Sequence, residues 1–137
     1  MVQRIRSGSP YESTIGFSRA VRVGNRVLVS GTAPIPPAGQ AVAQDAGDQM
    51  RRCGEIIAAA LQEAGADLTM VVRTRMFITD PAHADAVGAA HAELFGEAQP
   101  AATMVVAQLL DPAWKVEVEA EAVIPGAGGQ RAVGSRQ

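Results

Sequence analysis

The sequence predicts an α+β fold in which two helices cover one face of a mixed β-sheet. The prediction rests on short runs rich in β-branched residues, on two longer stretches with apolar residues every three or four positions, and on their order. That order is strand, strand, helix, strand, helix, strand, strand. A chain of 137 residues has the length of one domain. We predict a single domain over residues 1–124 and a flexible, Gly-rich C-terminal tail over residues 125–137.

A β-hairpin is the first predicted element. Its strands are residues 20–23 and 26–30, and the Gly24-Asn25 pair between them tolerates the positive φ angles of a two-residue turn. Three prolines within residues 33–39 lack backbone donors and fix φ, so the chain should leave the sheet there as a stiff loop.

Two helices are predicted. Residues 45–64 carry apolar side chains at spacings of three and four, and Gly65 provides a C-terminal stop. Residues 81–95 repeat this periodicity, and Pro81 suits a first helical turn. Cys53, the single cysteine, lies beside apolar residues of the first helix, where it is expected to be a small buried or half-buried filler rather than a nucleophile, without a disulfide partner.

Three further strands are predicted. Residues 69–78 form a β-rich run with both faces partly apolar, which is typical of a central strand. Residues 100–109 and 114–122 flank a short Asp111-Pro112 turn, and the second run alternates apolar and acidic residues. Two strands joined so tightly are expected to hold a carboxylate at a fixed place in a cleft beside the preceding strand.

Read together, Ser30-Gly31, the strand at 71–80, and the segments 100–109 and 114–122 resemble the Rid family, also called RidA-like or YjgF and formerly L-PSP endoribonucleases. This resemblance implies a chorismate-mutase-like fold and a homotrimeric barrel with outward-facing helices. It also implies sites in clefts between subunits, with no cofactor. The best understood members hydrolyse reactive enamines and imines, such as those derived from amino acids, to ketones and ammonia.

The resemblance implies that Glu117 is the catalytic residue. It lies fifteen positions after Ala102, in the place of the family's Glu that orients the attacking water. An apolar cleft would raise the pKa of such a carboxyl toward neutrality, which suits a general base. From the residues alone, the favoured alternative is that Glu117, Glu119 and Glu121 occupy the solvated face of an edge strand.

The same resemblance implies a set of substrate-binding positions. Ser30 and Gly31 match a Ser-Gly pair where the backbone approaches the ligand, and Gly permits that approach because it lacks a Cβ. Thr103 could hydrogen-bond a ligand or the backbone, whereas Met104 indicates a softer, more apolar pocket.

The chain departs from the family pattern at Ala102. Deaminating members carry a Pro-Ala-Arg-Ser motif whose Arg binds the substrate carboxylate, whereas this chain has Pro100-Ala101-Ala102-Thr103. Arg75 is the candidate replacement, because a charge among apolar strand residues needs a partner. The favoured alternative is a structural ion pair of Arg75 with Glu117 or Glu119, and Arg73 is a weaker candidate.

Composition excludes several classes of function. A net charge of -2 provides no basic field for nucleic acid, and no run approaches the length of a membrane span, so we expect a cytoplasmic protein. His83 and His91 are expected on the surface of the second helix, without the companions of a metal site.

We therefore predict a homotrimeric hydrolase, of the enamine and imine deaminase type, acting on a reactive small metabolite. Because Ala102 supplies no cation, 2-imino-acid deamination requires another cation at the site, or else the substrate lacks a carboxylate. The alternative is a trimer that binds a small ligand without turnover. Endoribonuclease activity ranks third, since the sequence shows neither a basic surface nor a catalytic pair of histidines.

Overall fold

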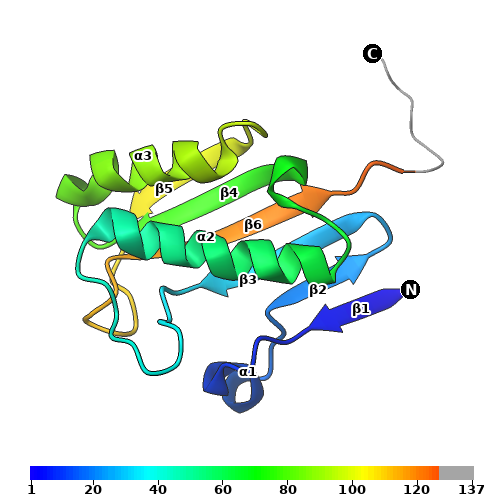
Figure 1. Cartoon of the computed structure of the whole chain (residues 1–137), viewed down its shortest axis with the longest axis horizontal. Coiled ribbons are helices and arrows are strands. Elements are labelled where there is room, and N and C mark those ends of the chain that lie inside the picture. The colour runs from blue at the N-terminus through cyan, green and yellow to red at the C-terminus, as the bar shows by residue number, and fades with distance from the viewer. Residues whose placement is uncertain (127–137) are drawn as a thin grey trace.

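The computed structural model describes residues 1–126, which form two layers (Figure 1). One layer is a six-stranded sheet, and the other consists of α2 (Ala46–Glu63) and α3 (Ala84–Phe95), which lie side by side across one face of it. The predicted mixed sheet with two helices on one face is confirmed. Residues 127–137, which make up most of the predicted tail, lie outside the described residues.

The sheet has the strand order β1-β2-β3-β6-β4-β5. Only the β4–β5 pair is parallel, and the other four neighbouring pairs are antiparallel. The strands are β1 (Val2–Ile5), β2 (Ala20–Val23), β3 (Arg26–Thr32), β4 (Val71–Ile78), β5 (Ala101–Val106) and β6 (Val116–Val123). The predicted hairpin is the β2–β3 pair, and Gly24 in its turn has a φ of 61°.

The expectation that the last two strands form a tight pair is wrong, because β4 lies between β5 and β6. Phe77 of β4 is in register with Val105 of β5 on one side and with Glu117 of β6 on the other. The central place of β6 suits its sequence, since Val116, Val118 and alternate residues after them are buried against the helices.

Both helices begin and end near the predicted positions. Asp45 caps α2 by accepting a hydrogen bond from the Asp48 N–H at 3.0 Å, and Gly65 follows the helix with a φ of 91°. The second predicted helix begins as a 3-10 turn, Pro81–His83, before it continues as α3.

The hydrophobic core lies between the sheet and the two helices. Cys53 is fully buried there, and the largest apolar side chains of the same core cluster include Met50, Ile57, Leu61 and Phe95. His91, which was expected on the helix surface, is half-buried, and its Nε2 lies 2.8 Å from the hydroxyl of the buried Thr74 on β4. No helix among the described residues is long and apolar enough to cross a membrane.

Two short elements near the N-terminus were not expected from the sequence. They are β1, which adds an edge strand beside β2, and α1 (Pro10–Ile15), which lies below the sheet edge in Figure 1. Ser9 caps α1, since its Oγ accepts from the Tyr11 N–H, and Gly16 ends the helix with a φ of 92°. These elements position the segment that closes one side of the candidate site.

Candidate active site

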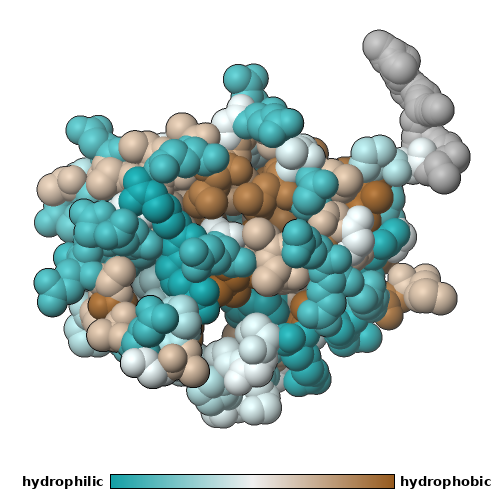
Figure 2. All heavy atoms as spheres, viewed as in Figure 1, coloured by the Kyte–Doolittle hydropathy of each residue, from teal (hydrophilic) through white to brown (hydrophobic). Residues whose placement is uncertain are grey.

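A cavity of about 530 Å³ opens between α1, the proline loop after β3, the first half of α2 and the start of β6. Figure 2 shows the surface hollowed beside α1. Its apolar wall includes Tyr11, Phe17, Ile35, Ile56 and Trp114. The rings of Tyr11 and Trp114 meet edge to face at 6.1 Å, so they hold α1 against the loop before β6. The cavity suits a small ligand with an apolar body.

Glu117 reaches this cavity from the start of β6. It lies against Gly31, which is within an irregularity of the β3–β6 ladder between Val29 and Thr32, and a Cβ built on Gly31 would stand only 2.5 Å from Glu117 Oε2. Burial raises the pKa of the Glu117 carboxyl, Arg19 opposes this effect, and Glu119 adds to it. The close approach expected at Gly31 is thus made by the Glu117 carboxylate of the same chain.

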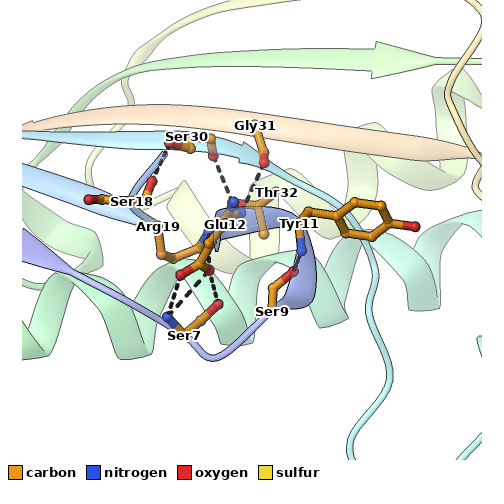
Figure 3. A network of polar contacts seen from close by, with 9 residues as sticks. All are labelled: Ser7, Ser9, Tyr11, Glu12, Ser18, Arg19, Ser30, Gly31 and Thr32. Carbon is orange, nitrogen blue, oxygen red and sulfur yellow. Dashed lines mark hydrogen bonds and ion pairs between the residues drawn. The ribbon is translucent and has the colours of Figure 1, made fainter. Parts of the chain in front are cut away.

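Arg19 is the second charged group beside Gly31 (Figure 3). Its side chain is 7% exposed, and its Nη1 donates to the Gly31 carbonyl and to Thr32 Oγ1, both at 2.9 Å. Burial lowers the pKa of this guanidinium, while Glu12 and Glu117 oppose that shift. Arg19 therefore carries a positive charge into the wall of the cavity at a site with little water.

Glu12 of α1 is the partner of Arg19. Its Oε2 lies 3.6 Å from Arg19 Nε, and its carboxylate accepts hydrogen bonds from the Ser7 N–H and from the Ser7 hydroxyl. Glu12 is 2% exposed, so this ion pair is buried and joins α1 to the strand that follows it. The network of Figure 3 thus fixes one wall of the cavity.

Neither Arg19 nor Glu12 was singled out from the sequence. A local signal for α1 exists, because Ser9-Pro10-Tyr11-Glu12 has the Ser-x-x-Glu form of a capping box. No comparable signal marks Arg19, since its burial depends on Glu12 and Gly31, which other segments contribute. Trp114 forms part of the cavity wall, where its ring meets that of Tyr11.

Arg75 forms the predicted structural ion pair. Its Nη1 lies 3.0 Å from Glu119 Oε1 and 3.5 Å from Glu121 Oε2, so its partners do not include Glu117. The Arg75 side chain is 40% exposed, and a pair at that exposure contributes less than about 1 kcal/mol. Arg75 is not part of the cavity lining, which leaves its predicted substrate-binding role without a structural basis within one chain.

The β5 positions also lie apart from the cavity in a single chain. Ala102 is exposed, Thr103 Oγ1 accepts from Arg73 Nη2 at 2.8 Å, and Met104 packs against the core. β5 is the sheet's last strand, so these residues are presented at an edge. Their predicted part in substrate binding stays a prediction that involves a second copy of the chain.

Ser30 has a structural contact rather than a place in this cavity. Its Oγ donates to the Ser18 carbonyl at 2.7 Å, and Ser30 lines a second hollow of about 580 Å³ together with Arg4 and Arg6. Within residues 1–126 no three His, Cys, Asp or Glu side chains gather closely enough to hold a metal ion.

Comparisons with known proteins agree with this architecture. A sequence model of the family described as Endoribonuclease L-PSP matches residues 8–124. An uncharacterized protein of Streptomyces coelicolor is 38% identical over 122 residues, which cover 88% of this chain and 91% of that protein. The 2-iminobutanoate/2-iminopropanoate deaminase of Salmonella typhimurium is 32% identical over 110 residues, covering 78% of this chain and 86% of that enzyme.

A solved structure extends the match to three dimensions. The crystal structure of a YjgF/YER057c/UK114 family member from Mycobacterium tuberculosis matches with a TM-score of 0.82 at 40% identity, covering 90% of this chain and 100% of that one. The family model spans nearly all of the described residues, and the strand order and helix layer accompany it. The chain therefore belongs to the YjgF/Rid family, whose sequence model carries the older description Endoribonuclease L-PSP.

Proposed function

We propose that this protein is a hydrolase of reactive imines or enamines, with Glu117 as the residue that positions and activates water. The observation that carries the proposal is the Glu117 carboxylate held against Gly31 in a largely apolar cavity, where burial raises its pKa. A carboxylate of raised pKa is a better general base than an ordinary one near neutral pH. The named deaminase among the relatives supports the same class of reaction.

The proposed reaction needs only water as a co-reactant. Water adds to the carbon of the C=N bond while the Glu117 carboxylate takes one of its protons, and the nitrogen is protonated as that bond becomes single. Glu117 passes the proton that it took from water to this nitrogen, which gives a carbinolamine. It then takes the hydroxyl proton of the carbinolamine and passes it to the nitrogen as the C–N bond breaks, so that ammonia leaves and a ketone remains. No electrons are transferred, and the balance is imine plus water to ketone plus ammonia.

Self-association as a homotrimer with shared clefts belongs to this proposal. It is supported by the edge position of β5 and by Val105 and Val106, which are 43% and 54% exposed there. A neighbouring copy would supply the positions Ala102 and Thr103 that a single chain keeps apart from Glu117. The mass of the purified protein in solution tests this part.

The direct test is hydrolysis of imines by the purified protein. An amino-acid oxidase generates 2-imino acids, and semicarbazide traps whatever imine survives. We expect the protein to shorten imine lifetime and Glu117→Gln to lose at least about a hundredfold of that effect, because the amide cannot accept a proton. If the protein does not accelerate imine loss at all, the hydrolase proposal fails for these substrates. That result would favour the alternative of a trimer that binds a small ligand without turnover.

The raised pKa of Glu117 gives a second expectation, for stability against pH. Between the ordinary carboxyl pKa of 4.5 and the higher folded value, the folded protein binds the extra proton, so this group's contribution to stability falls as pH rises through that window. Glu117→Gln removes the titration. The variant should therefore melt higher than the parent at about pH 8, and this advantage should shrink at about pH 4. An advantage that grows toward acid pH would contradict the raised pKa.

A further inference from the structure

Two cations line the cavity, and their surroundings differ. Arg52 of α2 donates from Nε to the Ile35 carbonyl at 2.6 Å and from Nη1 to Glu55 at 3.0 Å, and its side chain is 28% exposed. Arg52 thus braces the proline loop. Arg19 is more deeply buried and lies beside Gly31, against which Glu117 packs, so it is the cation nearer the proposed reaction centre.

Arg19 has donors left over. A guanidinium carries five N–H groups, and among the described residues Arg19 uses only those of Nη1 in hydrogen bonds. Its Nε is buried without a hydrogen bond, since Glu12 Oε2 stands 3.6 Å away. Buried donors without acceptors are uncommon and costly. An acceptor oxygen arriving in the cavity would complete this arrangement, and a carboxylate suits the planar fork of donors.

Gly31 joins Arg19 to Glu117. The Gly31 carbonyl accepts from Arg19 Nη1 at 2.9 Å, and the Glu117 carboxylate occupies the space where a side chain at Gly31 would begin. In a 2-imino acid the C=N carbon is bonded directly to the carboxylate carbon. A carboxylate held by Arg19 would therefore bring the reacting carbon toward the water that Glu117 positions.

We infer that Arg19 is the carboxylate-binding residue of this cavity, so that the substrate is a small imine or enamine with a carboxylate on an apolar body. The reaction named here rests on the proposed hydrolase function, whereas the binding of a carboxylate does not. Arg19 would thus bind the substrate carboxylate, which Ala102 cannot do because it has no cation. Arg75 does not do so within one chain, because it is paired with Glu119.

The charges around Glu117 make this binding depend on pH. Arg19 faces it from the segment before β2, Glu119 comes from its own strand, and Cys53 of α2 stays an uncharged thiol because burial raises its pKa. An anion at Arg19 adds a negative charge beside the Glu117 carboxylate. Binding should then be accompanied by proton uptake, and carboxylate affinity should fall as pH rises.

The test compares benzoate with benzamide, two ligands of the same shape that differ in charge, by titration calorimetry on the full-length protein at about pH 7. We expect benzoate to bind at least about tenfold more tightly than benzamide. The double variant Glu12→Gln, Arg19→Gln should bind both equally, and it removes both members of the buried ion pair, so neither is left without the other. Arg75→Gln, which lies outside the cavity lining, should keep the benzoate preference. Glu117→Gln should increase the affinity for benzoate at about pH 8, because it removes the negative charge beside the bound carboxylate.

Two results would overturn the inference: equal or absent binding of the two probes by the parent protein, or a benzoate preference that survives in the double variant. In the second case, loss of the preference in Arg52→Gln would identify Arg52 as the residue that binds the carboxylate. The hydrolysis assay separates the two proposals. A protein that prefers benzoate through Arg19 but hydrolyses no imine retains the inference and loses the hydrolase function. A protein that hydrolyses imines but shows no preference for benzoate retains the hydrolase function and loses the inference about Arg19.

Discussion

Gly31→Ala is expected to lose about a hundredfold of imine hydrolysis with little loss of stability. A Cβ at this position would stand 2.5 Å from Glu117 Oε2, so one of the two must move. The carboxylate is the far end of a flexible side chain, whereas Gly31 belongs to a paired strand, so Glu117 should give way. A displacement of about 1 Å of a group that positions a reactant costs on the order of a hundredfold in rate.

The backbone at Gly31 does not explain such a loss by itself. Gly31 is outside the left-handed region, in contrast to Gly16 and Gly65, so alanine can adopt its conformation without strain. Gly88→Ala is the matched control, because Gly88 lies within α3 and a Cβ there meets nothing within 4 Å. We expect that control to keep full activity and to gain about 0.5–1 kcal/mol of stability.

The measurements are the rate of imine loss and the melting temperature of each variant. A Gly31→Ala protein that hydrolyses imines at the parental rate would show that the contact between Gly31 and Glu117 has no part in catalysis. A large loss of rate together with a large drop in melting temperature would indicate instead that the substitution disturbs β3. The expected pattern is a large loss in rate, a small change in melting temperature, and no loss in Gly88→Ala.

Local patterns in the sequence predicted those elements whose structure is decided locally. The hairpin follows from Gly24-Asn25 between β-branched runs, and α2 follows from its apolar spacing between Asp45 and Gly65. β1 and α1 were missed because four and six residues are too few to show a period. The place of β6 between β3 and β4 was also missed, since the pairing partner of a strand depends on distant segments.

The same distinction applies to the candidate site. Glu117 could be proposed only through the family resemblance, because its alternation with buried residues also fits a solvated strand face. The Arg75–Glu119 pair was foreseen from the cost of an unpaired charge in a strand. Arg19 had no such signal, although it lies beside Gly31, since the sequence does not show that α1 folds back to place Glu12 next to it.

Glu12→Ala is expected to cost about 3 kcal/mol of unfolding free energy, more than any surface ion pair in this protein would. The substitution leaves Arg19 buried and charged without its partner, and it removes the acceptor of the Ser7 N–H. Denaturant unfolding measures this cost. The double variant Glu12→Gln, Arg19→Gln should recover most of it, because both charges are then absent.

The Arg51–Glu93 pair shows whether the N–O distance or the burial of an ion pair determines its contribution to stability. Its N–O distance is 2.7 Å, shorter than the 3.6 Å between Arg19 and Glu12, but its side chains are 44% and 57% exposed. Because water solvates both charges there, Glu93→Ala should cost much less stability than Glu12→Ala. If Glu12→Ala proves equally mild, the buried pair does not hold α1 in place. If Glu12→Ala costs much stability and the double variant restores it, the cost arises from the buried charge of Arg19. The need to pair that charge with Glu12 would then explain why α1 closes the cavity.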